Sequence, residues 1–234
     1  MILDSFKLET VVTQLRYADA FELWDRAGAI SRRLITIWPD LKLIEGIPQR
    51  QSLRGKGVDI QTGITQSTVT LSGPKSLEQG KIQQLKDTFE VWREVLALDS
   101  VKRISTRATY SKEFPTLKEA NAELFALNLA RWPTSKVFDQ PVDTERNGLE
   151  ILYRFEDQNS FSLLQLKAER LEFNVDLNPE WVDEPEIRKV KSRMVIDFDR
   201  GLLGTVSAEK FRMDDWIKGF QHILRRDIEK VIKA

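Results

Sequence analysis

The sequence reads VVTQLRY from Val11 to Tyr17, and it reads VKRISTRATY from Val101 to Tyr110. Both stretches are rich in β-branched residues, which is typical of β-strands. Each is followed by a helical pattern that ends at a Trp-Pro pair, Trp38-Pro39 or Trp132-Pro133. A residue before proline is disfavoured in the α conformation, so these pairs end helices. The sequence therefore predicts that one βα unit begins twice.

The spacing of landmarks supports an internal repeat. Tyr17 and Tyr110 are 93 positions apart, and Trp38 and Trp132 are 94 apart. The closing helices match less tightly, because Trp92 and Trp216 are 124 positions apart. The second half therefore needs about thirty extra residues in its strands and loops. We place them in two segments, Val137–Asn147 and Trp181–Glu186.

Apolar periodicity divides the rest of the first half. A helix is expected from about residue 21 to Trp38, and another from Leu77 to Leu98. Between them we expect three strands: Lys42–Ile47, Val58–Ile64 and Thr68–Ser72. The basic, glycine-bearing segment Arg50–Gly57 matches no phosphate-binding motif and leads into a strand, so we interpret it as a hairpin connection.

The second half follows the same plan. Its helix is expected from Thr116, which forms a capping box with Glu119, to Arg131. Three strands and a closing helix follow: Gly148–Phe155, Ser162–Val175, Arg188–Phe198 and Met213–Ile232. The apolar phase of the second of these strands slips between Ala168 and Leu171, which predicts a β-bulge or a tight turn.

These elements predict an α+β fold of two tandem βαβββα-like halves, residues 1–99 and 100–234, in one compact pseudo-symmetric domain. The sheet is expected to be mainly antiparallel, with helices packed on one face. Trp24, Trp92 and Trp216 fall on apolar helical stripes and are expected in the core.

The amino-acid composition argues against several classes of function. The chain of 234 residues has 36 Lys plus Arg and 36 Asp plus Glu, so it lacks the global positive charge of most nucleic-acid binders. It has no cysteine, which excludes thiolate zinc sites, iron–sulfur clusters, disulfides and cysteine nucleophiles. Residues Met1–Glu9 lack a basic and apolar signal pattern, and no apolar run approaches the roughly 20 residues that span a bilayer. We expect a cytoplasmic protein without membrane contact.

With its strand motifs VVTQLRY and VKRISTRATY, the chain resembles a sporadically distributed, functionally uncharacterised bacterial family of similar length. The resemblance extends over nearly the whole chain and implies two βαβββα-like halves. It brings no established activity, cofactor or catalytic residue.

Catalytic and metal chemistry find little support in the sequence. His222 is the only histidine, and no nucleophile or orienting group accompanies it in a recognisable pattern. Asp197 and Asp199 share one face of a strand and could bind Mg²⁺. Basic residues on the same strand parity instead favour a solvated, mixed-charge face. We expect no catalytic, cofactor or metal site, and a non-enzymatic role is favoured over an enzyme.

Strand parity also predicts a basic sheet face. Arg103 and Arg107 share one face of their strand, and Lys189, Lys191 and Arg193 share one face of another. With Arg16 on the first strand, they could hold phosphates, an acidic peptide or an acidic partner. Charged residues on the solvent face of any half-exposed antiparallel sheet give the same pattern, so both interpretations stay open.

Three hypotheses follow for function. The leading one is a non-enzymatic interaction module that docks a partner protein in a multi-component bacterial system, with Trp181 as a further contact. The alternative is nucleic-acid or anion binding through the basic strand face. The third is a small-ligand or enzymatic site in a cleft between the halves, where pockets are common. The identity of the partner and the oligomeric state are left open.

Overall fold

The computed structural model describes residues 2–129, 150–176 and 186–233. Within these ranges the fold is α+β, with four α-helices and one antiparallel sheet of nine strands. The elements of the first half, after a short 3₁₀ helix at Ile2–Ser5, are β1 (Lys7–Tyr17), α1 (Glu22–Ile37), β2 (Lys42–Ile47), β3 (Arg50–Gly55), β4 (Val58–Gly63), β5 (Gln66–Ser72) and α2 (Gln79–Val95). Those of the second half are β6 (Ser100–Phe114), α3 (Leu117–Ala126), β7 (Glu150–Glu156), β8 (Ser160–Asp176), β9 (Glu186–Ser207) and α4 (Met213–Lys233).

The two halves meet in the middle of the sheet. The strand order is β2-β3-β4-β5-β1-β6-β9-β8-β7, so β1 and β6 are neighbours and all strands of residues 1–99 lie on one side. Their antiparallel register places Thr13 opposite Thr106, and these two residues are 93 positions apart, as are Tyr17 and Tyr110. Equivalent residues of two related antiparallel strands face each other only at a twofold axis. Thr13 and Thr106 therefore lie on the axis that a twofold relation between the two halves would have.

Hydroxyl groups join the sheet and a helix at this axis. The Oγ1 atoms of Thr13 and Thr106 are 3.2 Å apart and buried, and Trp216 of α4 donates from Nε1 to Thr106 Oγ1 at 2.8 Å. Buried hydroxyl and indole groups need hydrogen-bond partners, because leaving one unpaired costs its full desolvation. The centre of the sheet thus fixes both the register of β1 and β6 and the position of α4.

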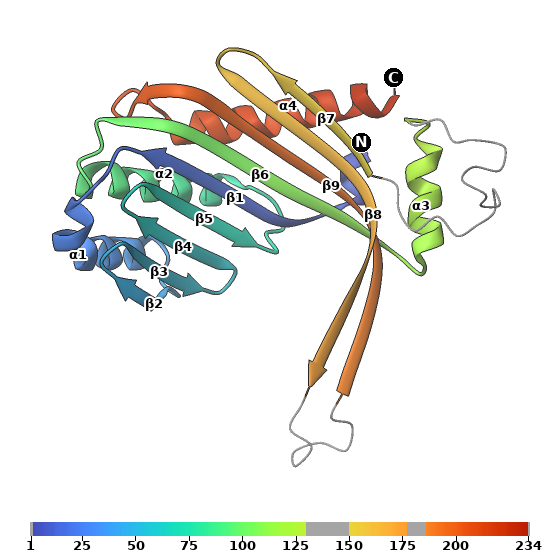
Figure 1. Ribbon diagram of the computed structural model, residues 1–234, viewed down its shortest axis with the longest axis horizontal. Helices are drawn as coiled ribbons and strands as arrows, with labels where there is room; N and C mark the ends of the chain where they lie inside the picture. Colours follow the sequence, from blue (N-terminus) through green and yellow to red (C-terminus); the bar gives the residue numbers. More distant parts are fainter. Residues whose placement is uncertain (1, 130–149, 177–185, 234) are drawn as a thin grey trace.

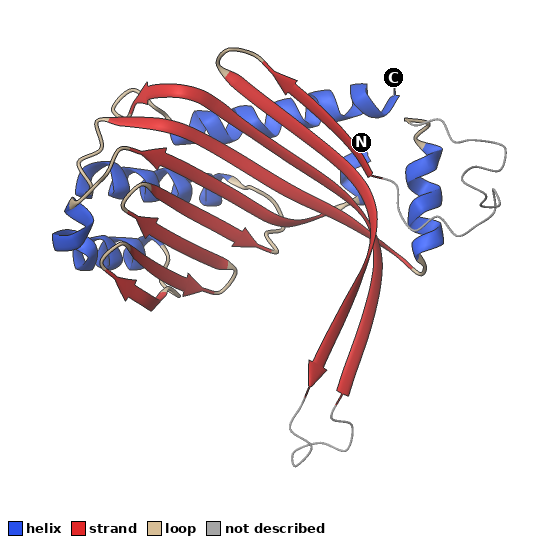
Figure 2. Cartoon of the chain, viewed as in Figure 1, coloured by secondary structure: helices blue, strands red, loops and turns tan. Residues whose placement is uncertain are grey.

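The helices pack on one face of the sheet. Figure 1 shows α1, α2 and α4 behind the strands, and Figure 2 shows the strands open toward the viewer. Alternate strand residues such as Val11, Leu15 and Ile104 are buried against them, together with Phe89 and Phe220 of the helices. This side holds the hydrophobic core, because each strand directs every second side chain to it.

Most of the segment Arg50–Gly57 forms a strand, β3, so the prediction of a connection there was wrong. The strand ends at Gly55, and Gly57 then makes the turn with a positive φ of 72°. On β3 the residues that face the core are Gln51 and Leu53, both buried. A polar glutamine at an inward position breaks the apolar alternation that would have marked the strand. The first half therefore has one strand more than expected.

The expected bulge between Ala168 and Leu171 was also wrong, because β8 and β9 keep one register from Ala168 opposite Met194 to Leu171 opposite Lys191. β6 pairs with β9 only as far as Ser192, and beyond it β8 and β9 continue as a narrow two-stranded ribbon (Figure 1). The apolar residues of β8 therefore switch from one face of the strand to the other near the point where β8 and β9 extend beyond β6 and leave the core.

The tryptophans differ from expectation in part. Trp92 is buried and donates to Thr62 Oγ1 at 2.9 Å, as expected for a core residue. Trp216 is half-buried, whereas Trp24 is 57% exposed and packs against the ring of Phe21, so its assignment to the core was wrong. The buried residue at this point of α1 is the adjacent Leu23, which shifts the buried face by one position.

Replacing Thr106 by valine should destabilise the protein more than replacing Thr13, because Thr106 is hydrogen-bonded to both Thr13 and Trp216. We expect Thr106→Val to lower the free energy of unfolding by about 1–3 kcal/mol and Thr13→Val by about 0.5–1.5 kcal/mol. Equilibrium urea denaturation measures both. Thr109→Val, on the other face of β6, is the control and should stay within about 0.5 kcal/mol of wild type. Equal losses at Thr13 and Thr106 would contradict the assignment.

Candidate functional site

The face of the sheet opposite the helices is the candidate functional surface, here called the open face. No described helix packs on it, and its central strands present short polar side chains. They come from β1, β5 and β6: Thr10, Gln14, Thr68, Thr70, Ser105 and Thr109. The open face is therefore polar, without the apolar surface of a second core.

The structure places five of the six predicted basic residues on this face, as strand parity indicated. Arg16 of β1 lies directly opposite Arg103 of β6. Arg107 follows on β6, opposite Asp199 of β9, and Arg193 and Lys191 lie further along β9. The backbone of Lys189 pairs with Phe173 in the two-stranded ribbon, and its side chain is outside the described part of the structure. Trp181 also lies outside the described residues.

Carboxylates neutralise several of these cations. Arg107 donates from Nε to both carboxylate oxygens of Asp197, at 2.8 and 2.9 Å. Arg193 donates to Glu169 at 2.7 Å and also to Glu9. Lys191 forms an ion pair with Glu113. Sequence reasoning missed these partners because they lie on other strands, up to 184 positions away in the case of Glu9 and Arg193.

Arg16 and Arg103 differ from the other cations. Within the described residues neither makes an ion pair or a hydrogen bond with a carboxylate, and Arg16 is exposed. The Nε atom of Arg103 is buried and has no hydrogen-bond partner in that part of the chain. Like charges directly across two strands are unfavourable. The arginine pair therefore places two positive charges without a direct carboxylate contact at the centre of the open face.

The aromatic ring of Phe161 packs against the guanidinium group of Arg103. The guanidinium carbon of Arg103 lies 4.8 Å from the centre of the Phe161 ring, a cation–π contact. The ring lies against Gly201, where a Cβ atom would come within 2.2 Å of it. Phe161 is only 6% exposed, so ring and guanidinium cover each other. Gly201 makes room for the ring, and the ring holds the cation in place.

Asp199 is the acidic group beside this pair. Its Oδ1 atom is buried without a hydrogen-bond partner among the described residues. Burial raises the pKa of Asp199 above its usual value, and the nearby charges of Arg107 and Arg103 offset only part of this effect. Asp199 is thus a poorly solvated carboxylate, and Arg103 is not neutralised by a direct contact with it.

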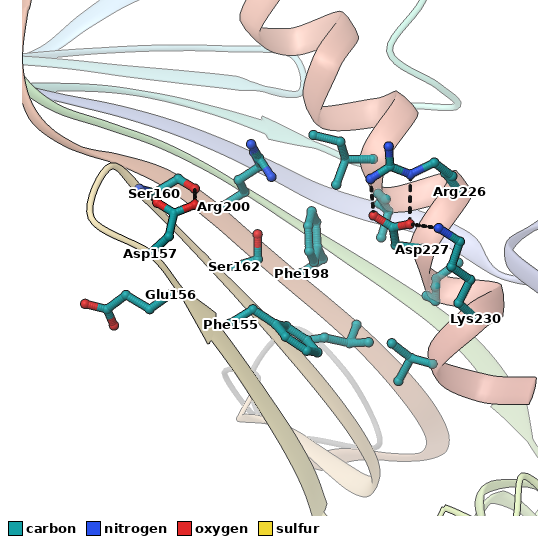
Figure 3. A pocket seen from close by; sticks show the side chains of 15 residues that line it. Phe155, Glu156, Asp157, Ser160, Ser162, Phe198, Arg200, Arg226, Asp227 and Lys230 are labelled. Carbon is teal, nitrogen blue, oxygen red and sulfur yellow. Dashed lines mark hydrogen bonds and ion pairs between the residues drawn. The ribbon is translucent and has the colours of Figure 1, made fainter. Parts of the chain in front are cut away.

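The described residues offer less support for other kinds of site. In the described residues no group of three or more His, Asp or Glu side chains is arranged to hold a metal ion. None of the described helices is long and apolar enough to cross a membrane. A cavity of about 430 Å³ lies between α4 and the strands β7, β8 and β9 (Figure 3), inside the second half, whereas the small-ligand hypothesis placed a site between the halves.

Comparisons with known proteins add little to this description. No family model matches the sequence, and no curated protein matches it. Among solved structures, crystal form I of TP0453 is similar at 12% identity over 91% of this chain and 93% of that one, with a TM-score of 0.18. A similarity of this level supports no inference about fold or function.

Arg107 and Arg54 give a contrast between a partly buried and an exposed ion pair. Asp197 is buried beneath Arg107, so Arg107→Gln leaves a buried carboxylate without its main partner and should cost about 1–3 kcal/mol of unfolding free energy. Arg54→Gln breaks an exposed pair with Asp59 and should cost less than about 1 kcal/mol. Urea denaturation compares them. An equal, small loss in both variants would show that the Arg107 pair has no structural role.

Asp199→Asn should stabilise the protein at neutral pH. Since the pKa of Asp199 is raised by burial, its ionisation disfavours the folded state above that pKa, and this penalty disappears as the pH falls through it. The stability difference between variant and wild type should therefore be positive near pH 7 and shrink toward about pH 4. Urea denaturation across this range measures it. A variant that is less stable than wild type at pH 7 would contradict the inference.

Proposed function

We propose that this protein is a non-enzymatic interaction module that docks a partner protein on its open face. The observation that carries the proposal is the arginine pair, Arg16 and Arg103, which lies without a carboxylate partner on the uncovered side of the sheet. Arginine is enriched at protein interfaces and often dominates their binding energy. A carboxylate of the partner would bind between the two guanidinium groups.

A carboxylate fits this site better than a nucleic-acid backbone. Duplex DNA carries one charge per about 1.7 Å, and proteins bind it with many unpaired cations along its path. On the open face Arg107, Arg193 and Lys191 are already neutralised by acidic neighbours. Two adjacent guanidinium groups suit a compact anion held by charge-assisted hydrogen bonds. Nucleic-acid binding is therefore the second candidate.

The wider setting follows from the sequence. We propose membership of the sporadically distributed bacterial family on the strand motifs, and a cytoplasmic location. A module without catalytic groups would act within a multi-component system, in which the partner supplies the activity. The partner is expected to present an acidic segment.

Reversing the charge of the arginine pair tests the proposal. The tagged full chain is purified from cells that carry its own gene neighbourhood, as wild type, Arg16→Glu/Arg103→Glu and Arg32→Glu/Arg225→Glu. The last variant changes the same number of charges on exposed positions of α1 and α4. We expect a stoichiometric partner with wild type and with the α1/α4 variant, and a loss of at least about tenfold with Arg16→Glu/Arg103→Glu.

Two results would contradict the proposal. One is a partner that binds equally to all three proteins, which would move the interface away from the arginine pair. The other is recovery of nucleic acid, detected by its absorbance at 260 nm, that is lost only from Arg16→Glu/Arg103→Glu and weakens steeply with salt. The second result would establish the alternative function.

A further inference from the structure

A second site lies on the helix side of the sheet. The cavity between α4 and β7, β8 and β9 has a volume of about 430 Å³, within the range of about 300–1,000 Å³ that holds small organic ligands. Its walls are mostly apolar and come from the strands and from α4: Leu164, Phe198, Ile223, Leu224, Ile228 and Val231. Figure 3 shows strand and helix side chains converging on it.

The acidic groups around this cavity already have partners. Asp227 accepts from Arg226 at 2.8 Å and from Lys230 at 2.9 Å, and these contacts hold the pKa of Asp227 well below its usual value. Asp157 accepts from the backbone amides of Asn159 and Ser160, both at 2.7 Å. These carboxylates, with their donors, form a polar rim. None of them requires a ligand cation.

Arg200 is the charged side chain with unused donors. It comes from β9 on the helix side, opposite Ser162 of β8, and lines the cavity. Within the described residues it has no hydrogen bond or ion pair in direct contact, and its charge reaches Asp157, whose pKa is lowered first by backbone hydrogen bonds and further by Arg200. Its guanidinium carbon lies 6.0 Å from the centre of the Trp216 ring, and Trp216 is fixed by its bond to Thr106. Figure 3 shows Arg200 extending from the strand into the space beside α4.

We propose that this cavity binds an apolar carboxylate of the fatty-acid type, with its hydrocarbon chain among the apolar walls and its carboxylate on Arg200. A guanidinium matches a carboxylate in bidentate geometry and neutralises its single charge. A phosphate would bring up to two negative charges near the carboxylates of Asp157 and Asp227, and Arg200 is the one lining cation whose donors are not already bonded to a carboxylate. The site therefore favours a monovalent head group on an apolar body.

Titration with dodecanoate tests the proposal. Isothermal calorimetry below the micelle concentration is done on the full chain as wild type, Arg200→Gln and Arg225→Gln. Arg225 is exposed on α4 and does not line the cavity. We expect one equivalent of dodecanoate to bind wild type and Arg225→Gln alike, and Arg200→Gln to bind about 10- to 100-fold more weakly. Dodecanol, which lacks the charge, should bind wild type more weakly by a similar factor.

Ser162→Phe provides a second test that does not depend on charge. Ser162 lines the cavity, and a phenylalanine there would occupy the space of the hydrocarbon chain, so dodecanoate binding should be lost. Arg16→Glu/Arg103→Glu should bind dodecanoate as wild type does, since the open face lies on the other side of the sheet. Thermal denaturation checks that each variant is folded.

Three outcomes would overturn the inference: no saturable binding to wild type, equal binding by Arg200→Gln and wild type, or unchanged binding by folded Ser162→Phe. The first means that the cavity does not bind an apolar carboxylate. The other two place dodecanoate elsewhere on the protein.

Discussion

The pairing of β1 with β6 around Thr13 and Thr106 is the constraint on which the architecture depends. It joins the two halves into one continuous sheet, and the bond from Trp216 to Thr106 fixes α4 on the same axis. A buried hydroxyl pair tolerates little change in register, because a shift of one residue would turn every inward side chain outward. The central pair therefore decides which face of all nine strands the helices cover.

The register of β1 and β6 also brings Arg16 and Arg103 together at one place on the open face. Arg16 and Arg103 lie three residues from the central threonines, and the position that a twofold relation would pair with them holds Thr10 opposite Thr109. These two positions therefore differ in charge, whereas the cations Arg107, Arg193 and Lys191 have acidic partners in direct contact. A sheet that carries the arginine pair at only one of these two positions suits binding of a single partner in one orientation. The cavity beside Arg200 is a separate site on the opposite side of the sheet.

Local patterns were enough to predict most elements, because apolar periodicity and Trp38-Pro39 act within a few residues; β2 was predicted to the residue and α4 to within one. β3 was missed since its inward Gln51 is polar, and Trp24 was misplaced because its neighbour Leu23 takes the buried position.

For the candidate site, strand parity gave the right face for Arg16, Arg103 and Arg107. It could not show which cations are neutralised, because that depends on register between strands far apart in sequence, and it gave no sign of Arg200, whose role depends on the shape between α4 and the sheet.

Site-specific photocrosslinking tests the central claim most directly, by asking which face the partner covers. A photoreactive residue replaces Gln14, on the open face of β1, or Gln83, on the exposed side of α2, in cells that carry the gene neighbourhood of the protein. The account predicts that the residue at position 14 captures a specific protein and that the residue at position 83 does not. Capture from position 83 alone would place the interface on the helices and contradict it.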